Sequence, residues 1–136
     1  MAKKHLIVQE QKEVQIIADV VARYYDLTMD EFKMKTRRRH IVTARHMYHY
    51  ICHKIIGFTT YKTGFLTDLD HATVLNSCKQ IDNWLSYDKK VQQDLKMILI
   101  TINNGNKYHE AVKLLYQVPS IKLERLKREI EKYIVA

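Results

Sequence analysis

Apolar residues recur along most of the chain at the spacing of one helix face. A first core helix is predicted over 14–25, with inward positions Val14, Ile17, Ala18, Val21 and Tyr25. Thr28 and Glu31 then have the spacing of a capping box, in which each side chain accepts the backbone N–H of the other residue. The pattern therefore predicts a short second helix over about 29–35.

A third helix is predicted over about 41–56, and Gly57 is suited to end it because glycine adopts the left-handed conformation at low cost. Its inward positions are Ala44, Met47, Tyr48, Ile51 and Ile55. Residues 35–40 read Lys-Thr-Arg-Arg-Arg-His, and we predict a basic loop there because neighbouring cations repel within a helix. Residues 58–67 are rich in Thr, Tyr and Phe, which suit a strand or a helix, and the prediction is a short helix and turn.

Another helix is predicted over 70–87, starting at Asp70. An aspartate ahead of an apolar-periodic run is a common start signal, because its carboxylate accepts free backbone N–H groups of the first turn. The apolar stripe of this helix is narrow and consists of Val74, Cys78, Ile81 and Leu85. The opposite face has no acid and consists of Ala72, Thr73, Asn76, Lys79, Gln80 and Asn83.

Three more helical patterns follow, over about 91–102, 108–118 and 123–134. The 136 residues are enough for one domain with an appendage. We therefore predict a helical domain over 1–87 and a helical extension over 88–136 that packs on it or serves in oligomerisation.

Composition favours an all-α protein. Three Gly and one Pro leave few places for the tight turns of an all-β fold. No apolar run reaches the roughly 18 residues of a membrane span, and charges stand where a signal peptide would be apolar, so we expect a cytoplasmic protein. Cys52 and Cys78 lie within predicted helices, where we expect buried, reduced thiols.

The net charge of +8 is concentrated in one quarter of the chain. Residues 33–67 contain eight Lys or Arg, four His and no Asp or Glu, while the remainder has equal numbers of bases and acids. A solvated charged face normally mixes both signs. Clustering of one sign instead indicates a polyanionic partner, and the segment stands directly before the polar helix face described above.

Catalytic and metal-binding interpretations receive less support. His46, His49 and His53 share one side of the third helix beside Cys52, but a single helix supplies them and no paired cysteine lies nearby. Phosphate contact or packing is the favoured interpretation, and we predict no metal and no cofactor. No carboxylate pair or clear Cys-His-Asn arrangement indicates an enzyme. A tyrosine stacking platform for single strands is a weaker reading than duplex binding.

Two stretches carry a family resemblance: VARYYDLTMDEFKMKTRRRHIVTARHMYHYICHKIIG and, after a gap, DHATVLNSCKQI. Over roughly 14–87 the chain resembles the C-terminal DNA-binding domain of DnaA, the bacterial chromosomal replication initiator. The most specific part is Asp-His-x-Thr-Val-Leu at residues 70–75. The resemblance implies a Trp-repressor-like helical domain whose helix-turn-helix binds a short, asymmetric, AT-rich box in duplex DNA.

The resemblance also implies roles for single residues. Arg37 would enter the minor groove, because a narrow AT-rich groove concentrates negative potential. Lys35 and Arg39 would contact the DNA backbone beside it, and Arg45 would approach the major groove. The full set of expected DNA-binding residues is Lys35, Arg37, Arg38, Arg39, Arg45, Asp70, His71, Thr73, Asn76 and Lys79.

Three of these residues would read bases from the start of the recognition helix. Asp70 would cap that helix and also accept a cytosine amino group or orient a basic side chain. His71 would donate to a base or phosphate, and Thr73 would contact a thymine methyl or a phosphate.

The chain also departs from the family pattern. Ala72 stands where the family usually has Thr, and Thr67-Asp68-Leu69 stands where it has Gly-Arg or Gly-Gly-Arg ahead of the Asp. Thr60-Tyr61-Lys62-Thr63-Gly64 replaces a Leu-Pro-Glu-Ile-Gly-like helix. These differences put the family's box sequence in doubt. The sequence also has no G-x-x-x-x-G-K-[ST] loop, so we expect no ATPase of its own.

Two hypotheses follow. The first is a sequence-specific duplex DNA binder in replication or transcription control, associated with the nucleoid. The second is a basic helical adaptor that binds DNA non-specifically and uses residues 88–136 for a protein partner or a second copy. A specific binder prefers one duplex by roughly 10³-fold or more, whereas non-specific binding is salt-dependent and independent of sequence.

Overall fold

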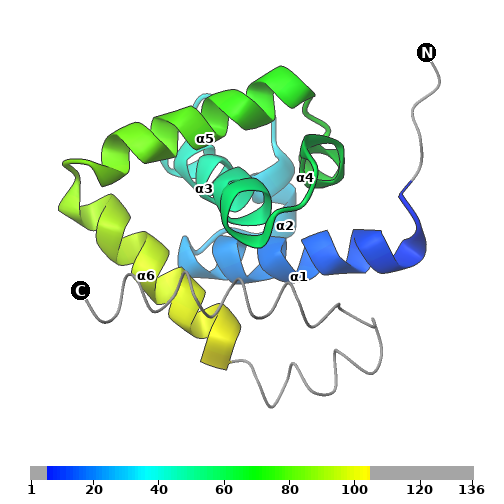
Figure 1. Ribbon diagram of the computed structural model, residues 1–136, viewed down its shortest axis with the longest axis horizontal. Coiled ribbons are helices and arrows are strands. Elements are labelled where there is room, and N and C mark those ends of the chain that lie inside the picture. The colour runs from blue at the N-terminus through cyan, green and yellow to red at the C-terminus, as the bar shows by residue number, and fades with distance from the viewer. Residues whose placement is uncertain (1–5, 105–136) are drawn as a thin grey trace.

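The computed structural model describes residues 6–104, which form six α-helices and one π-helix around one hydrophobic core (Figure 1). The elements are α1 (Val8–Tyr24), α2 (Met29–Lys33), α3 (Arg39–Tyr50), η1 (Ile51–Ile56), α4 (Thr60–Thr67), α5 (His71–Leu85) and α6 (Lys89–Asn104). The predicted all-α fold is confirmed. No helix in the described part of the chain is long and apolar enough to cross a membrane. The helices predicted over 108–118 and 123–134 lie outside the described residues.

Helix α3 lies at the centre of the fold, with α1 on one side and α5 on the other (Figure 1). Its side chains Ala44, Met47 and Tyr48 are fully buried. The ring of Tyr48 packs edge-on against Phe32, with 5.6 Å between centroids, and its hydroxyl donates to the Thr63 carbonyl at 3.0 Å. The central helix is thereby fixed to both α2 and α4.

Two local signals act as predicted. The Thr28 hydroxyl accepts the Glu31 N–H at 3.1 Å, and the Glu31 carboxylate accepts the Thr28 N–H at 3.0 Å, which completes the capping box of α2. Gly57 ends the helical stretch with φ of 94°, in the left-handed region that glycine adopts at low cost.

Several boundaries differ from the sequence prediction. Helix α1 begins at Val8 instead of residue 14. The apolar stripe did not predict these first turns, because Ile7 and Val8 are exposed and add nothing to it. The basic loop covers 34–38, and Arg39 already belongs to α3. The predicted third helix widens into the π-helix η1, in which the Gly57 N–H donates to the Cys52 carbonyl at 3.0 Å.

The ambiguous stretch 58–67 contains a helix, α4, whose N-cap Thr59 accepts the Lys62 N–H at 3.1 Å. Beyond the predicted boundary at residue 87, α6 contributes to the same core as α1 and α3 through Val91, Leu95, Ile98, Leu99 and Ile102. This first part of the predicted extension therefore packs on the domain. The division of the whole chain at residue 87 stays a prediction.

Candidate nucleic-acid interface

Helices α4 and α5 are joined by a three-residue turn, 68–70, which gives a helix-turn-helix. Asp68 adopts the left-handed conformation with φ of 53°, and the Leu69 N–H donates to the Gly64 carbonyl at 3.0 Å. A Cβ atom at Gly64 would lie 2.3 Å from the Leu69 carbonyl oxygen. Position 64 therefore needs a glycine, since the turn passes directly over α4.

The start of α5 combines a helix cap with exposed polar side chains. Asp70 Oδ1 accepts the Thr73 N–H at 2.9 Å, as the sequence predicted. Hydrogen bonds from the hydroxyl and backbone N–H of Thr73 lower the pKa of Asp70, so its carboxylate is charged. His71, Asn76 and Lys79 are exposed and Thr73 is half-buried, which leaves this part of the helix accessible to a ligand.

The first residues of the two helices are joined by a hydrogen bond. Thr60 Oγ1, at the beginning of α4, lies 2.8 Å from Nδ1 of His71, at the beginning of α5. Both residues line a hollow between α4 and α5 whose walls include Tyr61, Phe65 and Leu69. The sequence contained no signal for this pair, because it is formed only when α4 and α5 come together.

Arg45 holds the basic loop (residues 34–38) from within α3. Its guanidinium donates to the carbonyl of Met34 and, at 2.9 Å, to the carbonyl of Thr36. Partial burial lowers the pKa of Arg45. Lys35 and Arg37 are exposed on the loop that these two bonds fix. In the structure, the side chain expected to approach the major groove thus contacts the loop.

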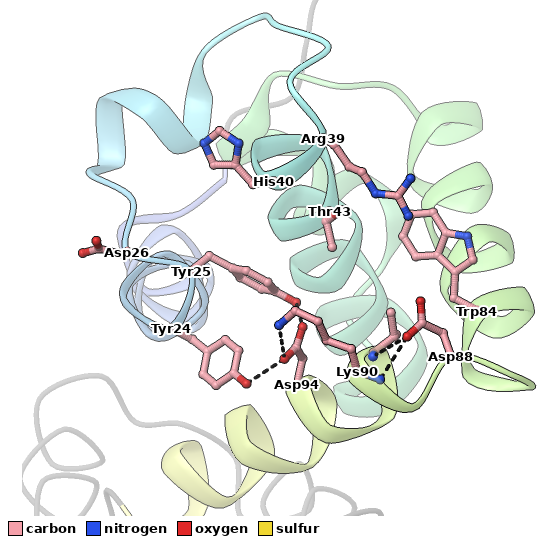
Figure 2. A pocket seen from close by; sticks show the side chains of 11 residues that line it. Tyr24, Tyr25, Asp26, Arg39, His40, Thr43, Trp84, Asp88, Lys90 and Asp94 are labelled. Carbon is pink, nitrogen blue, oxygen red and sulfur yellow. Dashed lines mark hydrogen bonds and ion pairs between the residues drawn. The ribbon is translucent and has the colours of Figure 1, made fainter.

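The two remaining arginines stand where the loop meets α3. Arg38 is the N-cap residue of α3, Arg39 is its first residue, and both are exposed. The guanidinium carbon of Arg39 lies 6.0 Å from the ring centroid of Trp84, near the end of α5 (Figure 2). An arginine near an aromatic face is attracted by the ring electrons. One basic side chain therefore lies against α5.

A cavity lined by Arg39 and Trp84 also contains a hydrogen-bonded carboxylate, Asp94 (Figure 2). Asp94 is buried and accepts the hydroxyls of Tyr24 at 2.7 Å and Tyr25 at 3.0 Å. Burial and the carboxylate beside it raise the pKa of Tyr24 to about 12. Lys90 Nζ lies 3.4 Å from Asp94 Oδ1 and supplies the opposite charge. The two tyrosine bonds join the end of α1 to α6, which is a structural role.

A buried polar network connects α3 to both helices of the helix-turn-helix. Nδ1 of His46 and Nδ1 of His49 each lie 2.8 Å from the hydroxyl of Ser77 in α5, and Nε2 of His49 lies 2.9 Å from the Thr67 hydroxyl in α4. Burial lowers the pKa of His49 to about 3, with smaller contributions from His46 and Arg45. His49 is therefore neutral at ordinary pH.

The third histidine of the predicted row has a different environment. Nδ1 of His53 lies 2.8 Å from the Phe58 carbonyl, away from the hydroxyl that His46 and His49 share. The described residues contain no group of three side chains placed to hold a metal ion. Sequence reasoning missed Ser77 and Thr67, because a buried hydroxyl partner has no spacing signature.

A helix-turn-helix with exposed polar residues at the start of its second helix, together with a basic loop held by Arg45, is typical of one class: helix-turn-helix DNA-binding domains. The family model described as "Bacterial dnaA protein helix-turn-helix" matches residues 14–81. The chain belongs to this family.

Similar proteins are named chromosomal replication initiator protein DnaA. The one from Bacteroides thetaiotaomicron is 36% identical over 83 residues, which are 60% of this chain and 18% of that protein. The one from Bacteroides fragilis is 35% identical over 91 residues, or 66% and 19%. The one from Flavobacterium psychrophilum is 32% identical over 87 residues, or 63% and 18%. The chain thus aligns with about a fifth of the length of these relatives.

Proposed function

We propose that this chain binds double-stranded DNA sequence-specifically, with the start of α5 in the major groove and the basic loop in the adjacent minor groove. The observation that supports this most is the joint anchoring of the two elements. Arg45 bonds to the loop and the next residue, His46, bonds to Ser77 in α5. Consecutive residues of one helix thus hold both proposed DNA-contacting elements, which favours a fixed register between the two grooves.

In this proposal each predicted residue has a task. Arg37 enters a narrow AT-rich minor groove, and Lys35, Arg38 and Arg39 contact phosphates on either side. Arg45 positions the loop and has guanidinium N–H groups left for the major-groove edge.

The recognition helix supplies the base contacts in this proposal. Asp70 and His71 read base edges, and Thr73 contacts a thymine methyl or a phosphate. Asn76 and Lys79 extend the contacts along the helix, where an amide pairs with adenine and an ammonium binds a phosphate.

The relatives' name motivates the biological setting. We propose an AT-rich, DnaA-box-like site in replication or transcription control, in the cytoplasm, with DNA binding as the whole activity and no catalysis. For the extension over 88–136 we keep the prediction of an oligomer face or a protein-partner site. Sedimentation of the chain tests the oligomer face, because it distinguishes a monomer from a larger species.

Selection from a random duplex library at near-physiological salt tests the proposal. The expected result is a short asymmetric motif containing AT pairs. A featureless pool would contradict sequence-specific binding and leave the basic adaptor as the function. Arg37→Ala is expected to weaken binding and reduce the AT preference, whereas Arg23→Ala on α1, outside the expected DNA-binding residues, is the matched control for loss of one exposed arginine.

A further inference from the structure

The bond between Thr60 and His71 fixes an exposed side chain at the start of α5. His71 is exposed, and its Nδ1 lies 2.8 Å from Thr60 Oγ1. An exposed imidazole turns freely about two side-chain torsions unless one ring nitrogen is held. With Nδ1 held against α4, Nε2 is the nitrogen left for a ligand.

The chemistry of the hydroxyl determines what Nε2 presents. The Thr60 hydroxyl can donate to Nδ1 of a neutral ring, which puts the ring hydrogen on Nε2, or accept from Nδ1–H. When the hydroxyl donates, and also when the ring is protonated, Nε2 carries a hydrogen. The side chain then offers an N–H donor, which pairs with purine N7, guanine O6 or thymine O4 in the major groove.

Thr60 lies in the stretch 60–64, where this chain differs from the family pattern. A Leu-Pro-Glu-Ile-Gly-like helix has no hydroxyl, whereas α4 begins with one at Thr60. The cap of α4 does not depend on it, because Thr59 accepts the Lys62 N–H. The Thr60 hydroxyl is thus not needed to begin the helix.

We propose that Thr60 is a positioning residue for base readout: it orients His71 so that Nε2–H donates to one acceptor in the major groove. The inference rests on the proposed sequence-specific binding and adds a residue of α4 to it. When α5 binds in the major groove, water that competes for the Thr60–His71 hydrogen bond is removed and the bond becomes stronger. The orientation of His71 is therefore best defined in the complex.

Binding of the full-length chain and its variants to the selected duplex tests the inference. Thr60→Val keeps the branched shape and removes the hydroxyl, so we expect affinity for that duplex to fall about tenfold, the value of one hydrogen bond. Thr60→Ser keeps the hydroxyl and should restore binding. Thr101→Val makes the same change on an exposed site of α6 and is the control.

A double-mutant cycle separates positioning from a structural effect. If Thr60 acts through His71, then Thr60→Val costs little more in a chain that already carries His71→Ala. An equal loss in both backgrounds, or full affinity of Thr60→Val, would overturn the inference.

The library selection separates this inference from the proposed function. If the unmodified chain selects no motif, sequence-specific binding and positioning are both overturned. If it selects a motif that Thr60→Val leaves unchanged in sequence and affinity, only the inference on Thr60 is overturned.

Discussion

Lys62 Nζ lies 2.6 Å from Glu13 Oε1, and both side chains are buried between α1 and α4. The ammonium also lies 3.8 Å from the ring centroid of Phe58. The second carboxylate oxygen of Glu13 has no hydrogen-bond partner. Helix α4, the first helix of the helix-turn-helix, is therefore joined to α1 by a buried ion pair in which only one carboxylate oxygen of Glu13 is hydrogen-bonded.

Breaking this pair from one side should cost more than removing both charges. Lys62→Met leaves a buried carboxylate without its cation, and we expect the free energy of unfolding to fall by about 3 kcal/mol. Lys62→Met combined with Glu13→Leu should recover most of that loss. Urea unfolding measures both values, and a single variant as stable as the unmodified chain would contradict the buried pair.

The turn of the helix-turn-helix should tolerate no side chain at position 64. Gly64→Ala places a Cβ against the Leu69 carbonyl oxygen, so the backbone has to move. We expect a loss of about 2 kcal/mol or more in the free energy of unfolding. Ala72→Gly, on the exposed face of α5, is a control expected to cost about 1 kcal/mol. A Gly64→Ala variant that unfolds like the unmodified chain would contradict the close approach.

The buried histidine makes stability depend on pH. His49 has a folded pKa of about 3 against an ordinary value of 6.5, so the unfolded chain takes up this proton first as the pH falls. Its contribution is complete above about pH 6.5 and is lost as the pH drops toward about 3. We expect about 2 kcal/mol less stability at about pH 5 than at about pH 7.

Chemical unfolding over this range checks the sign. His46 adds to the effect in the same direction, since burial also lowers its pKa. His49→Gln removes the main titrating group, and its stability should change less between the two pH values. Equal slopes for the variant and the unmodified chain would show that His49 does not carry the effect.

Elements set by neighbouring residues were predictable from the sequence. The Asp70 cap, the capping box of Thr28 and the glycine at position 57 each depend on a few adjacent side chains, and all three lie where the sequence indicated. The apolar stripes likewise identified the buried faces of α3 and α5, because burial follows the helical period.

Features that join distant segments were not predictable. The Glu13 to Lys62 pair joins residues 49 positions apart, and His49 meets Ser77 across 28 positions. Neither contact produces a periodic pattern in the sequence. The composition of residues 58–67 suits a strand or a helix, so the sequence alone left the choice open. In the structure this stretch contains the helix α4, which packs against α1, α3 and α5.

Arg45 should be sensitive even to replacement by lysine. A guanidinium reaches two loop carbonyls at once, whereas an ammonium is a single point of charge. We expect Arg45→Lys to weaken DNA binding about tenfold through a looser loop, with the unfolding midpoint nearly unchanged. Lys54→Arg, the reverse swap at an exposed cation of η1, is the control. Full affinity of Arg45→Lys would contradict the positioning role.

The ratio of two dissociation constants tests the central claim most directly. Fluorescence anisotropy at near-physiological salt would compare the duplex recovered by selection with a shuffled duplex of equal length and composition. Sequence-specific binding through α5 and the basic loop predicts a preference of about 10³-fold or more for the selected duplex. Equal constants for the two duplexes, both weakening steeply with salt, would contradict it and leave only attraction to phosphates.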